Sequence, residues 1–293
     1  MNTNLARYND GSNAPPRLRI QHSLWSLIKL PFNAPVEWTL SEKFARVRAQ
    51  GFEAVECWLT DENEAEHRAA LDAEELRLVL GHRPFRLEDV TATVERAKRL
   101  HADFVFAQPA DAFTPVAEVA ALVKEGRRIA NDAGLAFFVE IHRNNFTENL
   151  PQIKQLIELV PDIRFTADLS HLVVCGEFYG WEDERAVDRL MPVLERTSHL
   201  HGRISNGEQV QVDVGDGSNA TAQFFVRLWT AAMRHWLDGA GPGDVLPFAS
   251  ELGPPRYAIT TPEGKEISDR WEQSLVMKRL AAQAWSMAME GRG

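Results

Sequence analysis

The sequence has 293 residues, and its 42 acidic side chains against 32 lysines and arginines give a net charge of −10 at pH 7. This length is close to the roughly 250 residues typical of an eight-unit barrel, so one large domain with a sizeable core is expected. The negative charge opposes binding to a phosphate backbone unless basic residues gather in one patch, and the sequence contains no such patch. We therefore expect no nucleic-acid partner.

The lack of a recognisable targeting signal and the cysteine content favour a cytoplasmic protein. The first residues contain no apolar h-region, and nowhere does an uncharged apolar run approach the roughly 18 residues that a membrane span needs. Cys57 and Cys175 lie far apart without a CxxC spacing, which indicates a reducing compartment and no disulfide framework. No membrane partner is expected.

Residues 1–17 are rich in Asn, Gly, Ser and Pro, which predicts a disordered or loosely docked tail. The folded domain then extends over residues 18–293, where short apolar runs alternate with longer amphipathic stretches. In its first half, we predict strands over 18–27, 52–59, 76–82 and 103–108, and helices over 39–51, 61–75, 86–102 and 116–134.

The second half continues the same alternation. We predict strands over 135–142, 163–171, 199–205 and 245–253, and helices over 147–161, 181–196, 223–239 and 271–290. A capping-box pattern at Thr147 is expected to open the helix at 147–161. Eight strands, each followed by a helix through short connections, favour a closed (β/α)8 TIM barrel over an open doubly wound sheet.

The last four predicted strands each finish in an ionisable residue, in the sequences FFVE, FTAD, HLH and FASE. In a (β/α)8 barrel the carboxyl ends of the strands meet at one mouth, so these residues are expected to converge. Three carboxylates and an imidazole would repel one another unless a cation joined them, and they suit one divalent ion, Mn²⁺ first, with Mg²⁺, Co²⁺ and Zn²⁺ also fitting. The predicted ligands are Glu140, Asp168, His201 and Glu251.

With these residues in hand, the sequence resembles the xylose isomerase-like TIM barrel superfamily, in particular its sugar phosphate isomerase/epimerase branch. The segments VEIHRNNFTEN, ADLSHLVVCGE, HLHGRIS and SELGPPRY carry the resemblance, which covers about residues 18–290. It implies a metal on the same four residues, and Asp168-Leu-Ser-His171 reproduces an Asp-x-x-His motif whose histidine commonly contacts substrate. One departure concerns the arginine that ketose 3-epimerases have several residues after the metal histidine: Asn206 and Gly207 stand there, and the nearest arginine is Arg203.

This constellation suits proton transfer at a carbon next to a carbonyl. A metal-chelated hydroxy-ketone would lose its C–H proton more easily because the ion stabilises the negative charge that develops. Glu140 and Glu251 lie on strands separated by two others, so they could flank a bound sugar as catalytic acid and base. Transfer between opposite faces would be epimerisation, and transfer between neighbouring carbons would be isomerisation. The sequence leaves both open, for a sugar, a sugar phosphate or a keto-acid.

Several further residues are candidates for substrate binding, each with a structural alternative. His171 is expected to donate to a substrate oxygen or else to orient Asp168. Arg143 and Arg203 suit a phosphate or carboxylate but also an ion pair with a neighbouring acid. Gln211 lies in a long loop that is either a lid or merely solvated.

A second group of candidates comes from the strands themselves. Residues i and i+2 of a strand share a face, so His142 is expected near Glu140 at the mouth. Glu56 ends the second strand and could line the pocket. Three aromatic residues are either pocket or core residues, namely His22, Trp25 and Trp58.

Two other functions remain as alternatives to the isomerase. An apurinic endonuclease-like phosphodiester hydrolase would need a trinuclear zinc cluster with additional histidines, whereas this chain has Gln108 at the fourth strand end and Asp213-Val214-Gly215 where Asp-x-His is expected. A non-catalytic barrel that only binds a sugar is the other alternative. The expected partner is a small carbohydrate-like molecule, and a homo-oligomer is compatible with the sequence.

Overall fold

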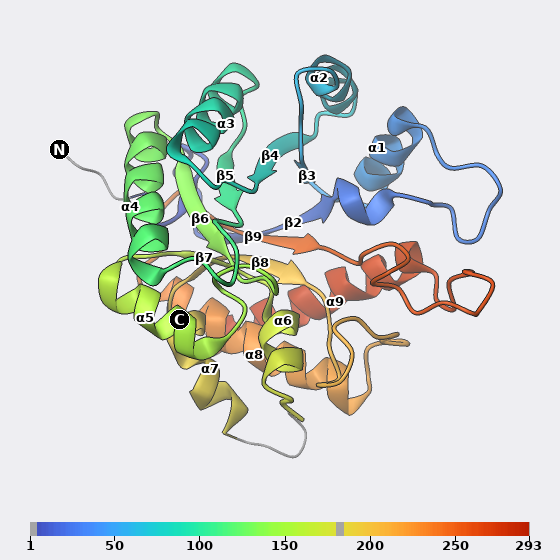
Figure 1. Cartoon of the computed structure of the whole chain (residues 1–293). Coiled ribbons are helices and arrows are strands. Elements are labelled where there is room, and N and C mark those ends of the chain that lie inside the picture. The colour runs from blue at the N-terminus through green and yellow to red at the C-terminus, as the bar shows by residue number, and fades with distance from the viewer. Residues whose placement is uncertain (1–4, 180–184, 293) are drawn as a thin grey trace.

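The computed structural model describes residues 5–179 and 185–292, and it confirms the predicted (β/α)8 barrel. Each barrel strand pairs in parallel with the next, and the last strand pairs with both the seventh barrel strand and the first, which closes the sheet (Figure 1). The barrel strands are β2 (Arg17–Ser23), β3 (Ala54–Cys57), β4 (Arg77–His82), β5 (Phe104–Ala107), β6 (Ala136–Glu140), β7 (Phe165–Ala167), β8 (Thr197–Gly202) and β9 (Asp244–Ser250).

The helices lie around the outside of this sheet, as Figure 1 shows. Their buried residues are mainly apolar and recur at helical spacing, for example Val119, Val123 and Ala130 in α4, so each helix covers the sheet with one face. The helical elements are η1 (Leu24–Leu27), α1 (Leu40–Ala49), α2 (Glu64–Ala73), α3 (Leu87–Arg99), α4 (Val116–Asp132), α5 (Leu150–Leu159), α6 (Leu169–Cys175), α7 (Ala186–Leu194), α8 (Ala220–Leu237) and α9 (Arg270–Met289).

Two local predictions in the second half of the chain were wrong. The strand predicted over 163–171 ends at Ala167, because the Asp168 side chain accepts a hydrogen bond from the Ser170 backbone and caps α6, a helix that we did not predict. Thr147 does not cap α5: Asn149 does so by accepting from the Gln152 backbone. Of the helix predicted over 181–196, residues 181–184 lie outside the described residues.

The described part of the segment predicted as a tail is attached to the barrel at several points, since Arg7 and Asp10 bond to the Trp236 and Gly243 carbonyl groups and Ala14 accepts from the Gly243 backbone. Arg17 is already the first residue of β2. Tyr8 and Asn9 form β1, which pairs antiparallel with the start of β9. Tyr8 is buried against Phe104, and the Arg19 guanidinium lies over its ring. These contacts are at the amino-terminal ends of the strands, so this segment closes the barrel end opposite the mouth.

None of the helices formed by the described residues has the length and apolar character needed to cross a membrane.

Candidate active site

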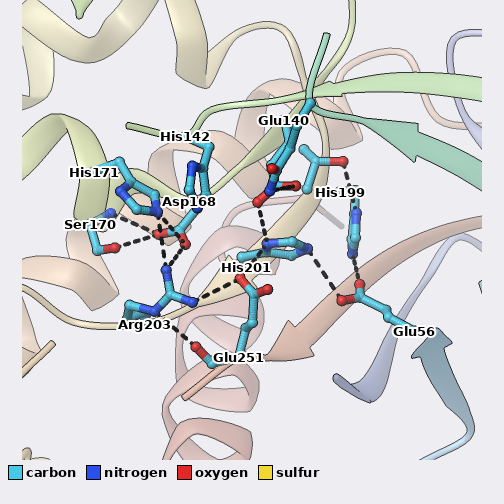
Figure 2. Close-up of polar contacts among 12 residues, drawn as sticks. Glu56, Glu140, His142, Asp168, Ser170, His171, His199, His201, Arg203 and Glu251 are labelled. Atoms are coloured by element: carbon cyan, nitrogen blue, oxygen red, sulfur yellow. Dashed lines mark hydrogen bonds and ion pairs between the residues drawn. The ribbon is translucent and has the colours of Figure 1, made fainter. Parts of the chain in front are cut away.

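The four predicted metal ligands all lie at the carboxyl ends of the strands, and all are buried. Glu140 is the last residue of β6, and His201 is the next-to-last residue of β8. Asp168 and Glu251 follow the last residues of β7 and β9 directly. Figure 2 shows their side chains pointing toward a common centre, although they come from four different strand ends spread over residues 140–251.

Glu140, His201 and Glu251 form the tightest group. The His201 Nδ1 atom lies 3.5 Å from Glu140 Oε1 and 2.7 Å from Glu251 Oε2. All three atoms are buried without a hydrogen-bond partner of acceptable geometry among the described residues, an arrangement that is costly unless something else satisfies them. Two carboxylate oxygens and an imidazole nitrogen within 4.8 Å of one another are suitable donors for a divalent cation. These residues therefore fit the predicted ion.

Asp168 is close to this group but is held by different contacts. Its Oδ2 accepts a hydrogen bond from Arg203 at 2.5 Å, and its Oδ1 accepts from the Ser170 backbone and hydroxyl. The same Arg203 guanidinium lies 3.1 Å from Glu251 Oε2, so it links Asp168 to Glu251. The structure thus brings Asp168 to the mouth in an ion pair, and its role as a fourth ligand stays a prediction.

Burial and neighbouring charges shift the pKa values of Glu140 and Glu251 in opposite directions. Burial raises the pKa of Glu140 to about 7. Burial would also raise the pKa of Glu251, but the neighbouring His201 and Arg203 lower it overall. Burial acts against protonation of His201, yet Glu251 and Glu56 outweigh it and raise its pKa well above the ordinary value. Two nearby carboxyl groups with different proton affinities are a common arrangement in sites that transfer protons.

Glu56 lies beneath the mouth, inside the barrel, and is not among the residues that line the main cavity. Its Oε2 is 3.3 Å from His201 Nε2, and its Oε1 is 2.7 Å from His199 Nε2. The Gln21 amide donates to the same Oε1 at 2.7 Å. Glu56 therefore holds His201 from below, which differs from the substrate contact that we predicted.

Sequence reasoning missed His199, which forms a second group of potential ligands with Glu56 and His201. The signal was present: residues two apart on a strand share a face, so His199 points into the barrel below His201. It is buried, and burial lowers its pKa to about 4. The Thr166 hydroxyl lies 2.9 Å from its Nδ1 and fixes the ring.

The two predicted substrate histidines differ in exposure. His171 is fully buried, with its Nε2 3.1 Å from Arg203 and 3.5 Å from Asp168. These contacts are the ones expected if His171 orients Asp168 and does not bind substrate. His142 lines the main cavity and stacks near His171, with 4.2 Å between the ring centroids. Burial lowers the pKa of His142 to about 4, so its ring is neutral at pH 7. The Tyr257 hydroxyl lies 3.2 Å from its Nε2.

The remaining predicted substrate residues occupy three different settings. Arg203 lines the cavity but is already paired with two acids, as described above. Arg143 is exposed and lies over the Tyr257 ring, outside the cavity lining. Gln211 is buried, and its amide exchanges hydrogen bonds with both backbone groups of Gly253. Gln211 therefore ties two loops together and is not solvated, and a role for its loop as a lid stays a prediction.

A cavity of about 740 Å³ opens at the mouth. Trp25 and Trp58 line it, whereas His22 packs in the core against Phe52 and Trp271. Gln108 also lines it, donating to Glu140 Oε2 at 2.9 Å while it accepts from Arg83. The floor of the cavity is thus polar, and much of its wall is aromatic. We did not predict Arg83, Tyr257 or the contact of Gln108 with Glu140.

The features expected of a nuclease do not gather at this mouth. Asp213 accepts a hydrogen bond from Ser268 and lines a separate small cavity. Gln108 occupies the fourth strand end and contacts Glu140 through its amide. Within residues 5–179 and 185–292, the potential metal ligands form two groups that share His201. This arrangement favours one metal ion over a trinuclear cluster.

No protein-family model matches the sequence, and no curated protein matches it. Solved structures do match over most of the chain. A D-tagatose 3-epimerase-like protein is 17% identical with a TM-score of 0.58, over 94% of this chain and 100% of that one. D-allulose 3-epimerase from Methylomonas sp. in complex with D-allulose is 14% identical with a TM-score of 0.60, over 93% and 99%.

A third similar structure is a xylose isomerase-like TIM barrel protein from Mycobacterium smegmatis in complex with magnesium. It is 13% identical with a TM-score of 0.59, over 93% of this chain and 98% of that one. At these identities the likeness shows the fold alone: the chain shares a (β/α)8 barrel with these three proteins.

Proposed function

We propose that this chain is a metal-dependent isomerase or epimerase that moves a proton next to the carbonyl of a sugar, a sugar phosphate or a keto-acid. One observation carries the proposal: Glu140, His201 and Glu251 bring two carboxylate oxygens and an imidazole nitrogen within 4.8 Å of one another at the base of the cavity, where these atoms are buried and make ion-pair contacts but no hydrogen bond of acceptable geometry among the described residues. Such a cluster is costly to fold and has no evident structural use, whereas a divalent ion with a chelating substrate would satisfy it.

The ion would be held by Glu140, His201 and Glu251, with Asp168 as the fourth ligand if Arg203 releases it. Mn²⁺ is our first choice because oxygen donors predominate, and Mg²⁺, Co²⁺ and Zn²⁺ also fit the donor set. When bound, a divalent ion polarises the substrate carbonyl and stabilises the negative charge that develops as the proton leaves.

The chain's own carboxylates would carry the proton. Glu251 lines the cavity, so it can reach a substrate C–H group directly. Glu140 lies on β6, which two strands separate from β9; its Oε1 is 3.5 Å from the same His201 Nδ1 atom that contacts Glu251, and Gln108 holds its second oxygen in place. Carboxylates on two sides of one ligand can exchange protons on opposite faces, which is the requirement for epimerisation. One carboxylate acting alone would give isomerisation.

Other cavity residues would orient the substrate. The neutral His142 ring can exchange a hydrogen bond with a hydroxyl group, and the Arg203 guanidinium adds positive charge next to Glu251. His171 and Ser170 hold Asp168, and Glu56 holds His201, so the groups that face the substrate are supported from behind. Support of this kind preserves the geometry that proton transfer requires.

The structures of similar fold support the proposal in two respects. One of them is described as a complex with D-allulose and another as a complex with magnesium, so barrels of this shape hold a small carbohydrate and a divalent ion. We propose the same classes of ligand for this chain, with a small carbohydrate as its partner.

Two measurements on the purified full chain test the proposal. Elemental analysis should find about one divalent ion per chain, and two or three zinc ions would instead revive the nuclease. Incubation in deuterium oxide with a panel of ketoses, their phosphates and keto-acids should place deuterium at the carbon next to the carbonyl. Turnover without solvent label would point to hydride transfer or hydrolysis, and ligand binding without turnover would favour the non-catalytic barrel.

A further inference from the structure

The main cavity is larger than proton transfer on a small ketose requires. Its volume is about 740 Å³. At about 30 Å³ per water this space holds roughly 25 water molecules, about twice the number of heavy atoms in a hexose. Pockets for drug-sized ligands range from about 300 to 1,000 Å³. A single sugar ring placed against Glu251 and Arg203 therefore leaves much of the cavity unfilled.

The unfilled part has an apolar wall, which we call the outer lobe. It is built by the first two βα units: η1 follows β2, α1 begins at Leu40, and Trp58 follows β3. Trp58 is 39% exposed and Ile28 is 38% exposed, so large apolar side chains remain open here instead of packing into the core. A contiguous open apolar patch next to a polar floor is typical of a ligand-binding surface. The outer lobe consists of Leu24, Trp25, Ile28, Leu40 and Trp58.

Both tryptophans of the outer lobe pack closely on a glycine. A Cβ atom at Gly253 would lie 2.3 Å from the Trp25 ring, and one at Gly81 would lie 2.9 Å from the Trp58 ring, so a larger residue at either position would displace a neighbouring ring. Tyr257 packs edge-on against Trp25 with 5.0 Å between ring centroids. Rigid aromatic surfaces bind a planar ligand with little loss of side-chain entropy.

The polar groups beside the outer lobe already have partners within the chain. Lys43 is paired with Glu37, and the Asn63 side chain accepts a hydrogen bond from the Thr60 backbone. The His67 Nδ1 atom lies 2.8 Å from the Asn63 carbonyl oxygen. With these groups engaged, the lobe offers surface for a neutral apolar group and not a cluster of free cations for a phosphate.

We propose that the natural substrate is a conjugate, in which a sugar ring at Glu251 is linked to a neutral aromatic or alicyclic group that fills the outer lobe. This inference rests on the proposed function, since it names the substrate class of the same site. A glycosidic link blocks the anomeric carbon. The carbonyl needed for proton transfer is then a ketone elsewhere on the sugar ring.

Binding of two matched glycosides tests the proposal without turnover. Isothermal titration of the full-length, Mn²⁺-loaded protein would compare phenyl and methyl D-glucopyranoside, using both anomers. The phenyl glycoside should bind at least about tenfold more tightly, equivalent to about 1.4 kcal/mol. Trp58→Ala should reduce this ratio to less than about threefold, because it removes the exposed indole ring from the lobe. Trp58→Phe keeps an aromatic ring there and should keep most of the phenyl preference.

Phe113→Ala is the matched control, since Phe113 is 89% exposed and does not line the cavity. It should leave the ratio unchanged. Equal affinities for the two glycosides in the parent protein, or a phenyl preference that survives in folded Trp58→Ala protein, would overturn the proposal. A phenyl preference without deuterium wash-in from either the ketose panel or phenyl D-glucopyranosides oxidised to a ring ketone would keep the apolar subsite and reject proton transfer, so the two failures can be told apart.

Discussion

The two halves of the barrel contribute different parts of the site. The four predicted metal ligands come from the second half, at the ends of β6, β7, β8 and β9, and His201, Glu251, Arg203 and Asp168 form successive ion pairs there (Figure 2). Glu56, on β3 in the first half, supports His201. The apolar wall comes from the segments that follow β2 and β3, and each of its tryptophans rests on a separate neighbour. Charge pairs make the ionisable residues of the second half interdependent, and we expect that residues of the apolar wall can be changed one at a time.

The largest effect is expected where the charged half is densest. His201→Ala removes the one side chain that contacts Glu56, Glu140 and Glu251 together, so it should weaken Mn²⁺ binding by about 100-fold or more, beyond the 10–100-fold typical of outer partners. Equilibrium dialysis against Mn²⁺ measures this. His235→Ala, a partly exposed histidine on α8, is the control. Unchanged affinity in His201→Ala would show that the metal is bound elsewhere.

The next effect separates metal binding from chemistry. Glu140→Gln and Glu251→Gln keep the side-chain shape and an oxygen but cannot take up a proton, so turnover should fall by about 10²–10⁴-fold. Metal occupancy should fall much less. Glu125→Gln, on the exposed face of α4, should retain full turnover. Solvent deuterium wash-in measures the proton transfer, and a variant that still incorporates label at the parental rate would lose its assignment as acid or base.

A smaller effect is expected one layer below the mouth. Glu56→Gln keeps the size of the side chain but removes the charge beside His201 and His199, so metal affinity should fall by about 10–100-fold. The matched control is Glu53→Gln. Glu53 lies three residues before Glu56 and forms a surface ion pair with Arg17. Metal affinity equal to that of the parent would mean that Glu56 only fills the barrel interior and does not orient His201.

The sequence was sufficient to predict the barrel and the mouth because both depend on local patterns. Apolar runs of strand length and amphipathic stretches of helix length give the eight units without any knowledge of contacts. An ionisable residue at the end of each of four strands then predicts convergence, because closing the barrel brings all strand ends together. This reasoning located Glu140, His201 and Glu251 correctly in space.

Other features could not be predicted because they depend on neighbours that are distant in the sequence. Arg203 is two residues beyond His201, yet its partners Asp168 and Glu251 are 35 and 48 residues away, so nothing local shows that both would hold it. Trp58 is open to the cavity and not part of the core because it follows the strand end. At Thr147 the local pattern itself misled, since its hydroxyl donates to the Glu140 carbonyl group and leaves the cap to Asn149.

The smallest effect tests whether the apolar half is energetically separate. Thr39 and Glu42 form a capping box at the start of α1: the Thr39 hydroxyl accepts from the Glu42 backbone, and the Glu42 carboxylate accepts from the Thr39 backbone. Thr39→Ala removes one of these bonds at an exposed helix end, so it should lower the free energy of unfolding by only about 1 kcal/mol. Urea unfolding measures this loss. Mn²⁺ affinity should stay at the parental value, because α1 contributes Leu40 and Lys43 to the cavity lining but none of the potential metal ligands. A fall in metal affinity together with the loss of stability would mean that the two halves are coupled. It would contradict the expectation that residues of the apolar wall can be changed one at a time without affecting the metal site.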